Sequence, residues 1–125
     1  MGNETEGVEE TTAREIVQRY ENGERFAVAL LAHVQGSAPQ KAGARLIVLP
    51  NGETRGTVGG GCLEMEARRR ALHTLRSEQS ERFELRLDDD FGWDDGLICG
   101  GKTTLLVCAD IAQIAPALRE AIAKR

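Results

Sequence analysis

Three consecutive glycines, Gly59 to Gly61, separate a segment with strand character from a segment with helical periodicity. Glycine loses more conformational freedom on folding than any other residue, so such a run is kept where the backbone bends sharply or approaches another group closely. Cys62 follows directly, at the start of the helical segment. A helix start favours an anion and a reactive thiolate. The stretch 56–66 therefore predicts either an anion-binding loop with a reactive thiol, or a tight turn beside a small buried cysteine.

A second constraint comes from Asn51-Gly52, which lies between two β-type segments. This dipeptide is the strongest short-range signal for a β-hairpin. If the turn closes one end of the hairpin, Gly43 and Gly59 lie together at the other end. The two glycine-rich loops that contain them, 35–43 and 56–62, are therefore expected side by side.

Hydrophobic periodicity predicts the remaining elements. Thr12 and Glu15 form a capping box, which predicts a helix that begins at Thr12, with the acidic residues 1–10 disordered before it. Further amphipathic stripes predict helices at 63–76 and 111–123. Apolar or alternating patterns predict strands at 26–34, 44–49, 53–58, 82–87 and 103–109. The fold class is therefore α+β (mixed α/β), with about five strands in a mixed sheet and three helices packed on it.

Composition narrows the class of protein. The length predicts a single domain, 1–125, and the scarcity of aromatic residues predicts an aliphatic core. A net charge of −4 argues against nucleic-acid binding. The polar start argues against a signal peptide, and the longest apolar run is too short for a membrane span. Three cysteines in such a chain indicate free thiols in a reducing cytoplasm. A small domain also gains from the added burial of a homodimer.

The candidate chemical groups are mainly thiols. Cys62 and Cys99 each adjoin a glycine pair in a predicted loop, whereas Cys108 lies in an apolar strand and is predicted to be a buried core residue. His33 is predicted in the core and His73 in solvent. The aspartates between the last two strands lack calcium-loop spacing and are expected to be solvated. Three roles stay open: a ligand-binding protein, a small thiol-dependent enzyme or phosphate-binding module that uses Cys62, and a purely protein-interaction domain.

Three glycine motifs carry a resemblance to a known family. They are Gly36-Ser37-Ala38-Pro39 with Gly43-Ala44, then Gly56 to Glu64, and then Gly96 to Gly101. In this order and spacing they resemble the N-terminal domain of the XdhC/CoxI family, the xanthine dehydrogenase accessory and carbon monoxide dehydrogenase maturation factors. Longer members carry a second, Rossmann-like domain, and none is expected in this chain. The sequence departs from the family pattern at Gln40, where an arginine is common, and at Gly59, where a serine is common.

What the resemblance implies is a cytoplasmic maturation factor or chaperone rather than an enzyme. Such a protein binds the molybdenum cofactor, as molybdopterin or its dinucleotide form, as cargo. It assists the sulfuration of the cofactor or its insertion into a molybdenum hydroxylase, such as xanthine dehydrogenase or carbon monoxide dehydrogenase. The implied partners are the hydroxylase apoenzyme and either a cysteine desulfurase or a separate Rossmann-like accessory protein.

The family's glycine–cysteine motifs map onto Cys62 and Cys99. Both thiols are expected to contact molybdenum or its sulfur, because thiolates suit a soft metal. The backbone N–H groups of Gly59 to Cys62 are expected to face the phosphate of the cofactor. The predicted cofactor-binding residues are Gly36, Ser37, Pro39, Gly43, Gly59, Gly60, Gly61, Cys62, Glu64, Cys99, Gly100 and Gly101.

Overall fold

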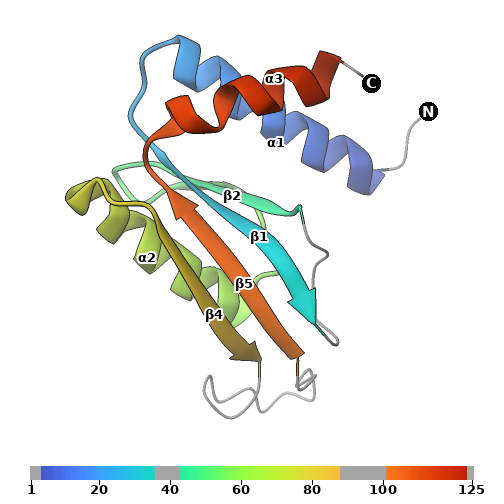
Figure 1. Ribbon diagram of the computed structural model, residues 1–125, viewed down its shortest axis with the longest axis vertical. Coiled ribbons are helices and arrows are strands. Elements are labelled where there is room, and N and C mark those ends of the chain that lie inside the picture. Colours follow the sequence, from blue (N-terminus) through green and yellow to red (C-terminus); the bar gives the residue numbers. More distant parts are fainter. Residues whose placement is uncertain (1–3, 36–42, 88–100, 124–125) are drawn as a thin grey trace.

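A five-stranded sheet with helices on both faces is the framework of the chain, as the computed structural model in Figure 1 shows. The structure describes residues 4–35, 43–87 and 101–123. The predicted α+β class is confirmed. The strands are β1 (Ala27–Gln35), β2 (Arg45–Val48), β3 (Thr54–Gly56), β4 (Glu81–Leu87) and β5 (Gly101–Cys108). The helices are α1 (Glu4–Glu21), α2 (Gly61–Ser77), α3 (Ala115–Ala123) and the short 3-10 helix η2 (Ile111–Gln113).

The sheet is antiparallel throughout, so the predicted mixed sheet was wrong. The strand order is β3-β2-β1-β5-β4, and each neighbouring pair runs antiparallel. Neighbouring parallel strands need a long crossover connection, usually a helix. Among the described residues, the one helix that lies between two strands, α2, connects β3 with β4, which form opposite edges of the sheet. The α2 crossover therefore joins two strands that are not neighbours in the sheet, and it creates no parallel pair.

The first helix is longer than predicted, because it begins at Glu4 rather than at Thr12. Thr12 is 6% exposed, and it packs against β3, where a Cβ on Gly56 would lie 3.3 Å from its hydroxyl oxygen. Glu15, the acidic member of the predicted capping box, instead accepts a 2.8 Å hydrogen bond from Arg19 Nε. The capping-box residues thus lie inside the helix and serve packing and an i,i+4 ion pair.

Successive side chains of the strands point alternately into two apolar cores, one on each face of the sheet. Along β1, Ala27, Ala29 and Leu31 face α2, whereas Val28 faces the α1 side. Such period-two alternation is what a strand buried on both faces requires. The α2 core consists of Ala27, Ala29, Leu31, Ala44, Leu46, Val48, Val58, Leu63, Ala67, Ala71, Leu75, Leu105 and Val107. The core on the α1 side consists of Ile16, Phe26, Val28, Ile47, Ile111 and Ala115.

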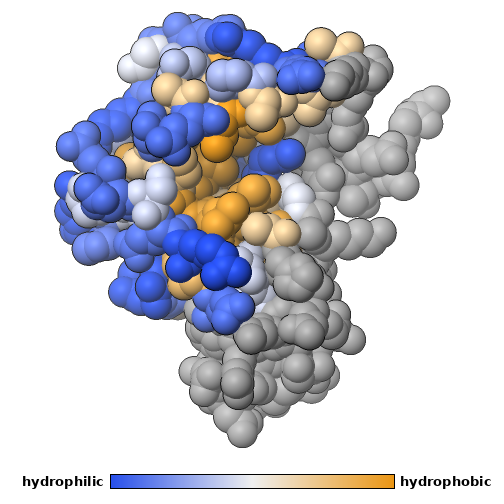
Figure 2. Space-filling view, viewed as in Figure 1, coloured by the Kyte–Doolittle hydropathy of each residue, from blue (hydrophilic) through white to orange (hydrophobic). Residues whose placement is uncertain are grey.

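The face opposite α2 is covered only in part. α1 and α3 pack against each other and against residues of β1 and β2, and both lie at the top of the view in Figure 1. On the same face of β5, Leu106 is 37% exposed. Figure 2 shows apolar side chains gathered in a hollow between these helices and the β4 side of the molecule. One half of this sheet face is therefore open.

Candidate functional site

The glycine run forms a turn that only glycine adopts without strain. Gly59, Gly60 and Gly61 have φ values of 124°, 76° and 59°, all in the left-handed region. A residue with a Cβ pays roughly 1–2 kcal/mol for each such conformation. The three glycines reverse the chain between β3 and α2 within a few residues, and α2 begins at Gly61. The predicted sharp turn before a helix is confirmed.

Glu64 holds this turn from within. Its Oε1 atom accepts a 2.6 Å hydrogen bond from the Thr57 hydroxyl and 3.3 Å hydrogen bonds from the backbone N–H groups of Val58 and Gly60. The Gly59 N–H donates to Thr57 Oγ1 over 2.9 Å. A carboxylate of the chain itself therefore accepts donors of the loop that was predicted to face a phosphate. The amides of Gly59 and Gly60 are used inside the turn.

Cys62 lies at the start of α2, where the sequence predicts it. It is the second residue of the helix, and its side chain is half-buried against the α2 core. The partial positive charge of a helix N-terminus is strongest in this first turn. The thiol thus combines partial access to solvent with a place in the first turn of a helix.

The hairpin brings the glycine turn to the place predicted for it. The Asn51-Gly52 turn links β2 and β3, and the Leu49 N–H donates to the Glu53 carbonyl over 2.8 Å. At the other end, the Thr57 N–H donates to the Arg45 carbonyl over 3.1 Å. Gly43 precedes Arg45 by two residues and Gly59 follows Thr57 by two, so both glycines flank this hydrogen bond.

The ends of β1 and β4 and the start of β5 lie together at one end of the sheet. In the strand register, Gln35 at the end of β1 pairs with Lys102, and Leu87 at the end of β4 pairs with Gly101. The segments 36–42 and 88–100 are thus anchored at neighbouring strand ends. Five predicted site residues lie outside the described residues, and their place at the site stays a prediction: Gly36, Ser37, Pro39, Cys99 and Gly100.

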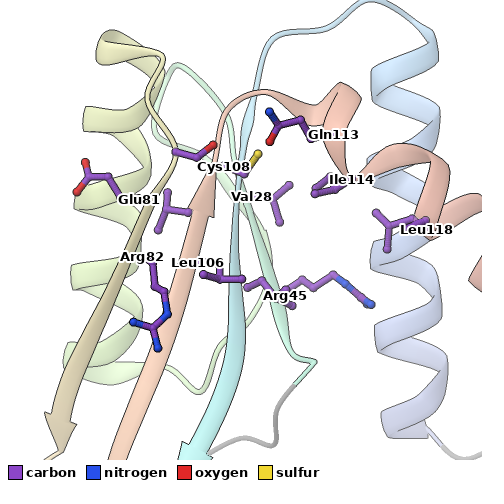
Figure 3. Close-up of a pocket in the computed structure, with 13 residues that line it drawn as sticks. Val28, Arg45, Glu81, Arg82, Leu106, Cys108, Gln113, Ile114 and Leu118 are labelled. Carbon is purple, nitrogen blue, oxygen red and sulfur yellow. The ribbon is translucent and has the colours of Figure 1, made fainter.

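A groove of about 480 Å³ lies on the opposite face of the sheet (Figure 3). Leu106, Ile114 and Leu118 line it, and Arg45 and Arg82 lie on its sides. Cys108 also lines this groove, so the prediction of a buried core cysteine was wrong. The strand that carries Cys108 is apolar, but its last residue lines the groove that β4 and β5 form with η2 and α3. The Cys108 thiol donates to the Asp110 carbonyl over 3.1 Å.

Of the two histidines, only His73 has a described side chain. His73 is 60% exposed and lies 3.8 Å from a Glu81 oxygen, as its solvated prediction requires. The side chain of His33 lies outside the described residues. Among the described side chains, no three histidines, cysteines or acids gather as a metal site. No helix in the described segments has the length and apolar character to cross a membrane.

Glu64 is predicted from the sequence as a cofactor-binding residue, which stays a prediction, and the structure adds a role for it within the turn. The missed signal is a threonine before the glycine run and a glutamate in the first turn of the helix. Such pairs resemble a capping box, in which a side-chain carboxylate reaches back to the N-cap N–H. Gly60 is the N-cap residue of α2 and makes that bond to Glu64. Glu64 is therefore a positioning residue for the loop that carries Cys62.

Known proteins match this chain over part of their length. The model of the XdhC and CoxI family matches residues 20–87, more than half of the chain. A probable xanthine dehydrogenase subunit of Bacillus subtilis (strain 168) is 32% identical over 83 residues, which are 65% of this chain and 25% of that protein. The molybdenum cofactor insertion chaperone PaoD of Escherichia coli (strain K12) is 31% identical over 96 residues, which are 76% of this chain and 30% of PaoD.

A solved structure gives the same result for the fold. The crystal structure of a xanthine dehydrogenase from Bacillus halodurans superposes with a TM-score of 0.70 at 22% identity, over 90% of this chain and 34% of that chain. The chain thus spans between a quarter and about a third of the length of these relatives. The family match covers the hairpin, the glycine turn and α2, which together carry Cys62. The chain belongs to the XdhC and CoxI family.

Proposed function

We propose that this chain binds the molybdenum cofactor as cargo and assists its insertion into a molybdenum hydroxylase. Membership of the XdhC and CoxI family supports this role, and so does the similarity to PaoD, which is named a molybdenum cofactor insertion chaperone. The observation that carries the proposal is the positive-φ glycine turn, which fixes Cys62 at the helix start beside the open end of the hairpin.

The thiol of Cys62 is the proposed contact to molybdenum or its terminal sulfur, because soft thiolate donors suit soft metal centres. Glu64 and Thr57 hold the turn through a 2.6 Å hydrogen bond, and Glu64 is also proposed to contact the cofactor. The phosphate of the cofactor would meet the first turn of α2, where the helix dipole favours an anion. Cys99 and its flanking glycines, with the segment 36–43, are proposed to complete the site.

The role is that of a carrier rather than an enzyme. In this proposal the recipient is the apoenzyme of a molybdenum hydroxylase of the xanthine dehydrogenase or carbon monoxide dehydrogenase type. A cysteine desulfurase or a separate Rossmann-like accessory protein would act with the chain when the terminal sulfur is installed. The involvement of each partner can be tested by adding it and measuring the transfer of cofactor from this chain to the apoenzyme.

Cofactor retention tests the proposal directly. The purified chain is mixed under anaerobic conditions with molybdenum cofactor released from a molybdoenzyme, and the mixture is separated by size. Molybdenum in the protein fraction is measured by mass spectrometry, and the pterin by fluorescence after oxidation. We expect both signals to co-elute with the wild-type chain in a constant ratio. Failure of the wild-type chain to retain either signal would refute cofactor binding.

The matched control is Cys108→Ser, because Cys108 is also half-buried but lies on the opposite face of the sheet. We expect Cys62→Ser to lower molybdenum retention several-fold while Cys108→Ser retains as much as the wild type. Circular dichroism verifies that both variants fold. Equal retention by the Cys62→Ser and Cys108→Ser variants would show that the thiol of Cys62 has no part in binding.

A further inference from the structure

α2 is the one described helix on its face of the sheet. It packs on β1, β5 and β2, whereas α1 and α3 lie on the opposite face (Figure 1). The side of α2 that points away from the sheet is therefore exposed. Between the two ends of the helix, the exposed side chains are Met65, Arg68, Arg69, His73 and Arg76. We call these five residues the outer face of α2.

The outer face of α2 is positively charged, although the net charge of the chain is −4. α2 carries four arginines and two glutamates, and neither glutamate is among its exposed residues. Glu64 accepts hydrogen bonds within the glycine turn, and the side chain of Glu66 is only 18% exposed. Arginine and methionine are enriched where proteins contact partners, whereas lysine and the acids are depleted. The outer face therefore has the composition of a protein-binding surface.

The arginines of this face keep their charge in the contacts that they make within the chain. Arg68 Nε donates to the neutral Gly52 carbonyl over 2.8 Å. Arg69 shares the Glu66 carboxylate with Arg70, so one negative charge serves two guanidinium groups. A guanidinium has five N–H donors, and these contacts use only some of them. The outer face thus retains both net positive charge and hydrogen-bond donors for a partner.

Cys62 lies on the same side of the helix as the outer face. At 3.6 residues per turn, Cys62 and the five residues fall within an arc of about 140° around the helix axis. Met65 follows Cys62 by one turn and is 72% exposed. A flexible methionine side chain suits contact with an apolar depression in another protein. A protein that takes cargo from Cys62 would therefore contact Met65 first and the arginines beyond it.

We propose that the outer face of α2 docks the molybdenum hydroxylase apoenzyme that receives the cofactor. This inference rests on the proposed function, which puts the cargo at Cys62. The charge of the face calls for an acidic surface on the apoenzyme, with carboxylates opposite the arginines and an apolar depression for Met65. Electrostatic attraction of this kind speeds association and weakens with salt, which suits a protein that delivers its cargo and then leaves.

Surface plasmon resonance with the cofactor-free chain tests docking separately from cofactor binding. The proteins on the chip are the molybdenum hydroxylase apoenzymes of the organism that makes this chain. The double variant Arg69→Glu/Arg76→Glu is expected to raise the Kd about tenfold at low salt, mainly through slower association. At about 1 M salt, where the Debye length is about 3 Å, this difference should largely disappear. Met65→Ser is expected to raise the Kd several-fold at both salt concentrations, because its contact is apolar.

The matched control is Arg82→Glu/Arg119→Glu, which makes the same change in net charge on the opposite face of the sheet. Both double variants replace exposed arginines, and one arginine of each, Arg69 or Arg119, forms an ion pair with a glutamate of the chain. We expect the control to bind the apoenzyme like the wild type, and circular dichroism verifies that all variants fold. A wild type that binds no apoenzyme would overturn the proposal, and so would equal weakening by the two double variants.

Two further measurements separate the apoenzyme from other occupants of this face. Phosphatidylglycerol vesicles and duplex DNA are injected at the same salt, and tighter binding to either than to the apoenzyme would overturn the proposal. Cofactor retention by Arg69→Glu/Arg76→Glu should equal that of the wild type, because the outer face contains none of the proposed cofactor contacts. Lost retention would assign these arginines to the cofactor phosphate instead. Docking by a wild type that retains no cofactor would refute the cargo role and leave the interface standing.

Discussion

Removal of the Glu64 carboxylate is the sharpest test of how the glycine turn is held. Glu64→Ala deletes the acceptor of three hydrogen bonds, from the Thr57 hydroxyl and from the N–H groups of Val58 and Gly60. The turn then loses the group that links β3 to the first turn of α2. Glu64→Gln keeps an oxygen in the same place but removes its charge, so the two variants separate the bond from the charge.

The expected loss in the free energy of unfolding follows from the lengths of these three hydrogen bonds. The 2.6 Å bond from Thr57 is short and charge-assisted, and such bonds contribute about 1.5–3 kcal/mol. The two 3.3 Å bonds lie beyond the usual N–H···O range and add little. The site is only part-buried, which weakens all three. We therefore expect Glu64→Ala to lower the free energy of unfolding by about 2 kcal/mol and Glu64→Gln by about 1 kcal/mol.

Urea denaturation followed by circular dichroism measures both values, and an unchanged slope against urea shows that the same folded core is lost. Glu66→Ala on the same helix is the control, because its carboxylate pairs with two surface arginines and should contribute less than about 1 kcal/mol. A double-mutant cycle with Thr57→Val should show coupling of roughly 1 kcal/mol. A Glu64→Ala cost no greater than that of Glu66→Ala would refute the reasoning.

Three further comparisons between variants have outcomes set by particular contacts. Gly60→Ala meets open space but keeps a left-handed φ, so it should cost about 1–2 kcal/mol in thermal unfolding. Gly56→Ala should cost more, because its Cβ would lie 2.5 Å from a backbone carbonyl oxygen; equal costs would contradict this. Leu105→Ala in the core should cost about 2–5 kcal/mol, whereas Leu106→Ala on the open face should cost far less. Hydrogen bonds from the neighbouring arginines lower the pKa of Glu66, so its contribution is full at neutral pH and is lost as the pH falls through the folded-state value. The stability difference between wild type and Glu66→Gln should therefore vanish in acid, and a constant difference across the titration would disprove the linkage.

Local signals in the sequence determined the elements and the glycine turn. Asn51-Gly52 predicts a hairpin, and in the turn Gly52 takes a positive φ of 92° while the Asn51 side-chain oxygen accepts a 2.9 Å hydrogen bond from the Glu53 N–H. The hairpin alone brings the stretches around Gly43 and Gly59 together. Three glycines before an amphipathic stretch likewise determine a sharp turn into a helix. These features depend on backbone sterics over a few residues, so they can be predicted without knowledge of the rest of the chain.

Contacts between distant residues decided the rest. The direction of the strands depended on which edges α2 connects, and no local pattern encodes that choice. Cys108 sits in an apolar strand, yet it is partly open because α1 and α3 cover only one side of that sheet face. The sequence predicts Glu64 as a cofactor-binding residue, and only the folded turn brings the Thr57 hydroxyl within hydrogen-bond distance of its carboxylate. The sequence by itself determined where the chain turns and where Cys62 stands. Tertiary structure decided which polar groups the turn uses itself, because a carboxylate bonds the donors that folding brings within its reach.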